Sequence, residues 1–264
     1  FWQNIREREI PSNQPMNRPI APSQVKWEKL PPDYILPDDP VDNIAQPALA
    51  EALSDSLETA GYLGETAFTC TNYGLCAVVD GKMVVKAPDW AYVAQTWVSR
   101  ETIARSYTPN LDGEIPKIVM EFLSETEGTE YSIKPTYPPG KWFFYEQVLQ
   151  VPNYALFDIA TGELELYRLN SSQVYEVQPP NEKGRYWLEE MNLYLGVWQG
   201  SRRNRTGDWL RWWDEQENLL LWGTELAQRE RETAQRERET AQRERDRAER
   251  FAAQLRAMGI EPED

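Results

Sequence analysis

A short apolar segment near the middle of the chain, residues 118–123, limits the fold most strongly. Five of its six residues are apolar, and the exception is Glu121. A continuous apolar run of this length is typical of a central strand that is buried on both faces. A carboxylate inside such a strand is costly to bury unless it is paired or bound to a metal ion. The segment therefore predicts a central strand in a sheet and marks Glu121 as a candidate site residue.

The segments around this run predict a mixed arrangement of strands and helices. Asp80 and Gly81 form a predicted tight turn between two of the strands, and residues 141–150 have the apolar spacing of a helix. The other strand-like segments are residues 67–71, 75–79, 83–93, 151–158 and 164–169. This order predicts an α/β or α+β fold, with a mixed β-sheet core that is flanked by helices.

The chain divides into an arm, a domain and a tail. Residues 1–46 are rich in Pro, Asn and charge, and they predict an extended, partly disordered arm. Residues 47–224 are expected to form one domain, which begins with a helix from Pro47 to about Tyr62. Residues 225–264 form the charged tail.

The tail is a near-identical seven-residue repeat and predicts one long helix. Each repeat places an acidic residue four positions before an Arg, which is the favourable order for ion pairs along a helix. A strong coiled coil has two apolar positions per heptad, whereas here one small residue recurs. That residue stands at Ala227, Ala234, Ala241 and Ala248. Residues 225–264 therefore predict either a solvated single helix or a weak coiled coil, formed with a partner helix or in a homo-oligomer.

The composition limits the chemistry that the chain can perform. It has no His and two Cys, Cys70 and Cys76, which excludes His-based catalysis and most zinc sites. Catalysis would rest on carboxylates, Lys, Arg, Tyr or Ser, and carboxylates favour an oxygen-binding metal such as Mg²⁺. The cysteine content fits a reduced, cytoplasmic protein. No run reaches the roughly 18 apolar residues that a membrane span requires, so we expect no membrane association.

Asp89 and Glu121 are the residues best placed for a carboxylate metal site. Asp89 follows Pro88 at a predicted strand bend, and Glu121 lies within the next predicted strand. Two such carboxylates could hold a divalent ion that activates water and neutralises the charge that develops during phosphodiester hydrolysis. From spacing alone, the alternative is a pair of strand-end acids that face water on a solvated sheet edge.

Four segments resemble successive motifs of one protein family. They are Lys86-Ala87-Pro88-Asp89 and residues 118–124, 141–145 and 151–158. In this order they are similar to the Uma-type family of restriction endonucleases, which belongs to the PD-(D/E)XK superfamily and is abundant in cyanobacteria. The resemblance covers roughly residues 45–200. A charged helical tail after the domain is also similar to many cyanobacterial members.

The resemblance implies a restriction-endonuclease-like fold and a DNA endonuclease activity. Asp89 and Glu121 match the acidic residues of the motifs, so both would bind Mg²⁺, with Mn²⁺ as a substitute. Together with an assisting Lys, they would form the catalytic centre. The chain's partner would then be DNA.

The assisting Lys is the point at which this chain departs from the superfamily pattern. That pattern has a Lys two residues beyond the Glu, where this chain has Leu123. The resemblance implies that Lys141 of the following helix replaces it, in a Lys-x-x-x-Tyr pair with Tyr145. Lys134 lies in the same connection and is a competitor. A second departure is Asn153, which stands where Glu is common.

The acidity of the chain leaves a second function open. The formal net charge is −15, which would weaken non-specific DNA binding and make it depend on local patches. The alternative is a catalytically silent, nuclease-like interaction protein that uses its charged helical tail to bind a partner.

Two further features have alternative interpretations. The basic loop at residues 201–205 could contact a phosphate backbone or lie solvated on the surface. The Trp cluster at residues 209–222 could stack on bases or fill the core. Within that cluster, residues 209–213 and 219–222 are expected to pair as a β-hairpin that closes the domain.

Overall fold

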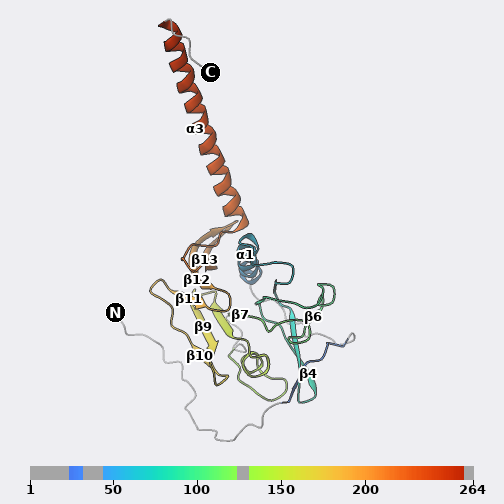
Figure 1. Ribbon diagram of the computed structural model, residues 1–264. Helices are drawn as coiled ribbons and strands as arrows, with labels where there is room; N and C mark the ends of the chain where they lie inside the picture. The colour runs from blue at the N-terminus through green and yellow to red at the C-terminus, as the bar shows by residue number, and fades with distance from the viewer. Residues whose placement is uncertain (1–23, 32–43, 124–130, 259–264) are drawn as a thin grey trace, which may run out of the picture.

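The computed structural model describes residues 24–31, 44–123 and 131–258, which form a mixed α+β domain and one long projecting helix (Figure 1). This confirms the predicted fold class. The remainder of the predicted arm, 1–23 and 32–43, lies outside the described residues. The helical elements are α1 (Ala45–Thr59), α2 (Lys141–Phe143), the π-helix η1 (Phe144–Leu149) and α3 (Gly223–Ala257).

The largest sheet has the strand order β10-β9-β8-β7-β5-β2. β7 pairs with β8 in parallel, and the other neighbours are antiparallel, so the sheet is mixed as predicted. β7 lies inside this order, which confirms the central position predicted from its apolar run. The strands are β2 (Phe68–Cys70), β5 (Trp90–Val93), β7 (Ile118–Leu123), β8 (Asn153–Asp158), β9 (Leu164–Leu169) and β10 (Tyr175–Val177).

A second sheet covers part of the first and joins it at the candidate site. Its strands are β1 (Val25–Lys26), β3 (Gly74–Val79), β4 (Lys82–Lys86) and β6 (Ser106–Tyr107). The single strand predicted over residues 83–93 is divided between β4 of this sheet and β5 of the first. The division falls at Ala87-Pro88-Asp89, because Pro88 has no N–H to continue a ladder.

The third sheet consists of β11 (Arg185–Leu188), β12 (Leu193–Arg202) and β13 (Arg205–Trp213), all antiparallel. It corrects the predicted closing hairpin. β13 pairs over its whole length with β12, through a turn at Arg203 and Asn204 in which Arg203 has φ 54°. Leu219 forms one isolated bridge with Trp213, after which the chain enters α3. The hairpin prediction was wrong because the longer β12 segment offers β13 a ten-residue partner, whereas residues 219–222 are too short to compete.

Two apolar layers form on the opposite faces of the largest sheet. On one face, the leucines of α1 and the tryptophans of the third sheet pack against Trp90, Met120 and Phe157. On the other face, the second sheet and η1 pack against Ala91, Val119 and Leu156. Because side chains alternate along a strand, odd-numbered positions of β7 face this second layer. Glu121 therefore lies between the largest sheet and the layer that contains η1.

The position of the first helix and the burial of three Trp side chains agree with the predictions made from the sequence. α1 starts two residues before the predicted Pro47 and ends at Thr59, followed by Gly61 at φ 82°. Trp209, Trp212 and Trp222 are at most 1% exposed, which confirms that these side chains fill the core.

The long C-terminal helix α3 was predicted from its repeat and has 35 residues. At about 1.5 Å per residue it is about 50 Å long, and it projects from the domain in Figure 1. None of its residues is buried. Among the described helices, α3 included, none has the length and apolar character that crossing a membrane requires.

Candidate active site

Asp89, the residue immediately before β5, lies beside Glu121 of the neighbouring strand β7, at the largest sheet. The antiparallel register pairs Trp90 with Met120, which places Asp89 beside Glu121 where β5 begins. Asp89 Oδ2 accepts a hydrogen bond of 2.6 Å from the backbone N–H of Phe122. The structure therefore brings together the two acidic residues that the sequence singled out.

The Glu121 carboxylate is fully buried and is held by two donors from one helical segment. Lys141 Nζ donates to Glu121 Oε2 at 3.0 Å, and Tyr145 OH donates to Oε1 at 3.0 Å. The Lys141 side chain is 21% exposed, so its ammonium lies at the boundary between the buried carboxylate and solvent.

The helical segment that carries both donors changes its geometry along its length. It matches the predicted helix at residues 141–150, but from Phe144 onwards it is the π-helix η1. Gln150, at φ 57°, ends it. Single-turn π segments within helices are frequent at functional sites. Here, α2 and η1 present Lys141 and Tyr145 to opposite oxygens of one carboxylate.

Gly140 fixes the start of this segment against the preceding loop. Its N–H donates to Lys134 O at 2.9 Å, and a Cβ added at Gly140 would lie 2.0 Å from Ser132 O. The backbone of the loop therefore approaches closely where only glycine fits. This contact sets the position from which Lys141 reaches Glu121.

Burial dominates the electrostatics of the site. It raises the pKa of Glu121 from the usual 4.5 to about 8, and the nearby Asp89 adds to the increase. Lys141 and the hydrogen bond from Tyr145 act in the opposite direction without cancelling it. Burial, followed by the charge of Glu121, also raises the pKa of Tyr145 well above its usual value. The phenol therefore keeps its proton and acts as a donor.

The two candidate lysines lie in different environments. Lys134 is exposed on the loop before Gly140, whereas Lys141 contacts Glu121 directly. Leu123 is the last residue of β7 and lies on the same face of the strand as Glu121. A Lys at that position would extend from the same strand, whereas Lys141 approaches from the facing layer.

The residues present fit a divalent cation with oxygen ligands. Within the described residues no group of three or more His, Cys, Asp or Glu side chains could hold a metal ion, so the protein's share would be two carboxylates. Mg²⁺ is commonly held in this way, by one or two carboxylates together with waters and substrate phosphates. Each oxygen of Glu121 has a second lone pair beyond the one that its donor uses. When Glu121 loses its proton, the two carboxylates beside the Lys141 ammonium leave negative charge that a cation would balance.

One contact beside the site was not evident in the sequence. Gln46 Nε2 donates to Phe122 O at 2.9 Å, so both backbone groups of Phe122 are held, the N–H by Asp89 and the carbonyl by α1. Nothing in the spacing of Gln46 signals this contact, because α1 and β7 are brought together only by the tertiary fold.

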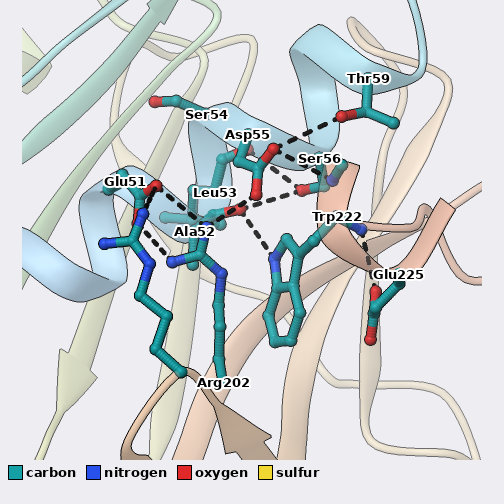
Figure 2. Close-up of polar contacts among 12 residues, drawn as sticks. Glu51, Ala52, Leu53, Ser54, Asp55, Ser56, Thr59, Arg202, Trp222 and Glu225 are labelled. Atoms are coloured by element: carbon teal, nitrogen blue, oxygen red, sulfur yellow. Dashed lines mark hydrogen bonds and ion pairs between the residues drawn. The ribbon is translucent and has the colours of Figure 1, made fainter. Parts of the chain in front are cut away.

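The predicted basic loop corresponds to the β12–β13 turn, and its first Arg does not face solvent. The Arg202 side chain is 5% exposed and pairs with Glu51 and Asp55 of α1 (Figure 2). Neither phosphate contact nor solvation describes Arg202, since α1 supplies carboxylates that the local sequence does not show. Arg203 is 70% exposed and also pairs with Glu51.

Comparison with known proteins identifies the family of this chain. Residues 44–203, more than half of the chain, match the Uma2 family, whose description is "Putative restriction endonuclease". A comparison with curated proteins gives no match. The matched range contains the Pro-Asp bend, β7 and the Lys-x-x-x-Tyr segment, and the chain belongs to the Uma2 family.

Proposed function

We propose that this protein is a Mg²⁺-dependent endonuclease that hydrolyses DNA phosphodiester bonds, with Asp89, Glu121 and Lys141 as its catalytic residues. One observation carries the proposal. The ammonium of Lys141 and the phenol of Tyr145 both hold the fully buried Glu121 carboxylate, on the strand next to Asp89. Membership in a family described as restriction endonucleases supports the same chemistry.

Asp89 and Glu121 would bind the metal ion. Mg²⁺, or Mn²⁺ in its place, would supply an activated water and balance the charge that develops on the phosphate. Asp89 uses Oδ2 to bind the N–H of Phe122, and this bond orients its carboxylate. Tyr145 and Lys141 orient Glu121 in the same way, so both carboxylates are held in position, one at the start of β5 and one in β7, before a metal ion binds.

Lys141 has a second role at the solvent boundary. Its side chain is 21% exposed, so its positive charge lies where it would stabilise the attacking water or a phosphate oxygen of a bound substrate. The residue would thus both position Glu121 and stabilise negative charge on the substrate.

The loop that precedes Lys141 offers positive charge for DNA binding in spite of the net charge of the chain. Residues 131–141 contain two Lys and no acidic residue. Tyr137 of this loop donates to Met83 O of β4, and Lys82 Nζ lies 4.8 Å from the Tyr137 ring centroid. Lys134 and Lys82 are exposed. We propose that the DNA backbone approaches across this loop and β4, and that binding depends strongly on salt.

The test is cleavage of plasmid and single-stranded DNA by the purified chain with Mg²⁺ or Mn²⁺. Cleavage should disappear in Asp89→Asn and Glu121→Gln and persist in Glu163→Gln, which removes an exposed acid away from the site. Equal cleavage by the wild type and both site variants would contradict the proposal and indicate a contaminating nuclease.

Metal binding can be measured separately from activity. Isothermal titration with Mn²⁺ should give heat with the wild type and with Glu163→Gln, and much less with Asp89→Asn. Metal binding without cleavage of either DNA would favour the alternative function, a catalytically silent nuclease-like protein that binds a partner through its helical tail.

A further inference from the structure

The outer face of α3 satisfies its charges within the helix. Glu232 pairs with Arg236 and Glu239 pairs with Arg243, each four residues apart. The glutamines join the same network, through Gln228 to Glu232, Gln235 to Glu239 and Gln242 to Asp246. These contacts repeat every seven residues, so the acidic side chains on this face have partners within the helix.

The opposite face of α3 differs. It is centred on the column of Ala234, Ala241 and Ala248, and no hydrogen bond or ion pair with any described residue engages the acidic and basic side chains beside this column. These side chains are Glu230, Arg231, Glu237, Arg238, Glu244 and Arg245. All of them are exposed.

The helical geometry sorts these unpaired charges into two rows. Successive residues turn by about 100°, so the Glu residues lie about 40–60° to one side of the nearest Ala, and the Arg residues lie about 40–60° to the other side. The face therefore has a row of small side chains, flanked by a Glu row and an Arg row that run along the helix. A stripe of this kind is complementary to a second copy of itself in one orientation.

We propose that α3 pairs in parallel with the α3 helix of a second copy of this chain, with the two Ala columns in contact. A two-fold axis parallel to the helices places the Glu row of each copy against the Arg row of the other, on both sides of the contact. An antiparallel pair would place Glu against Glu on one side and Arg against Arg on the other. Alanine at the contact allows the two backbones to approach closely. The matching heptad spacing keeps the rows aligned through a left-handed supercoil.

The base of α3 is held by the domain, which leaves the pairing face free. Trp222 Nε1 donates to Ala52 O at 3.0 Å (Figure 2), and the Gly223 N–H donates to Asp55 Oδ1 at 3.1 Å. Glu225 accepts from Arg211 at 2.7 Å. From Gln228 onwards every residue except Ala252 and Leu255 is exposed up to the end of the helix. Pairing through Ala234 and later residues therefore begins beyond the anchored first turn.

Charge complementation tests the proposal. One full-length variant replaces Glu230, Glu237 and Glu244 with Arg, and a second replaces Arg231, Arg238 and Arg245 with Glu. In sedimentation equilibrium, the wild type should dimerise, each variant alone should be monomeric, and an equimolar mixture of the two should dimerise again. A control variant replaces three acids of the outer face, Glu232, Glu239 and Asp246, with Arg and should dimerise like the wild type. The Kd of the wild type should rise by about tenfold or more between about 0.01 M and 1 M salt, as the screening length falls from about 30 Å to about 3 Å.

Cysteine cross-linking tests the orientation. A parallel pair in register brings residue 234 next to residue 234 and residue 248 next to residue 248, so Ala234→Cys and Ala248→Cys should each form a disulfide-linked dimer under mild oxidation. An antiparallel pair in one register cannot bring both into contact with themselves. The wild type, with its native Cys70 and Cys76, is the control for other cross-links.

Three results would overturn the proposal. The first is a wild type that stays monomeric up to about 1 mM protein, which would put any Kd for self-association above that concentration. The second is a mixture of the charge variants that does not associate. The third is cross-linking at one position of the two and not at the other.

Discussion

Lys141 Nζ lies 3.0 Å from Glu121 Oε2, and these two atoms connect the largest sheet with the helical segment packed on it. The family pattern of an acid followed two positions later by Lys would place both groups on one strand. Here the Lys141 ammonium reaches Glu121 from the layer that packs on the sheet, and Leu123 occupies the position two residues after Glu121 on β7. The position of the ammonium therefore depends on how α2 and η1 dock, which makes the docking contacts part of the site.

Lys141→Ala should reduce DNA cleavage by about a hundredfold or more, because it removes both a support of Glu121 and a positive charge at the reaction centre. Lys134→Ala removes an equal charge from the exposed loop and should reduce cleavage far less. Initial rates at saturating DNA would compare the two. A larger loss with Lys134→Ala would mean that the loop, rather than the helix, supplies the active-site Lys.

The stability of the metal-free protein should depend on pH through Glu121. Its pKa is about 8 when folded and near 4.5 otherwise, so the folded state keeps a proton that the unfolded state loses between these values. The contribution is complete below about pH 4.5 and is lost as the pH rises towards 8, with a slope of at most about 1.4 kcal/mol per pH unit. Urea unfolding of the wild type relative to Glu121→Gln measures it, since Gln does not titrate. A difference that stays constant or grows with pH would contradict the burial argument.

Gly140→Ala should destabilise the loop at residues 131–140 and weaken cleavage, because its Cβ would overlap Ser132 O at 2.0 Å. The matched change Gly207→Ala adds a methyl group where nothing lies within 4 Å and should leave both properties nearly unchanged. Thermal unfolding and cleavage rates distinguish them. If Gly140→Ala were as active and stable as Gly207→Ala, the position of Lys141 would not depend on this close approach.

Arg202 and Arg203 form a matched pair for testing the anchoring of α1. The Arg202 side chain is 5% exposed and pairs with both Glu51 and Asp55, whereas Arg203 is 70% exposed and shares Glu51. Arg202→Ala should lower the free energy of unfolding by about 2–4 kcal/mol, because it removes a buried partner from two carboxylates. Arg203→Ala should change it by less than about 1 kcal/mol, as for other exposed ion pairs. If chemical denaturation gave the same loss of unfolding free energy for both variants, burial of Arg202 would contribute little to stability.

The sequence predicted those parts of the fold that depend on local pattern. The apolar run around Glu121 identified the central strand, and Pro88 marked the point at which the chain leaves one sheet for another. The heptad repeat identified α3. In each case the residues that determine the structure lie within a few positions of one another, so spacing and backbone chemistry were sufficient.

The parts that were not predicted depend on partners far away in the chain. The β12–β13 pairing replaced the predicted hairpin because β12 is long enough to pair with the whole of β13. The carboxylates that bury Arg202 are about 150 residues earlier, on α1. The π-helical geometry of η1 also had no local signal. Which lysine approaches Glu121 was an open choice, because the docking of a loop against Ser132 cannot be read from spacing.

The contacts between α1 and the C-terminal part of the domain have a consequence for synthesis. Leu53 O accepts from Trp212 and Ala52 O accepts from Trp222, across separations of 159 and 170 residues. As the chain emerges from a ribosome, α1 comes out well before β13 and Trp222, so the part of its surface that these residues cover stays exposed until most of the domain has followed. Complete packing of α1 must then wait for nearly the whole domain, and the nascent chain is open to chaperone binding during that interval.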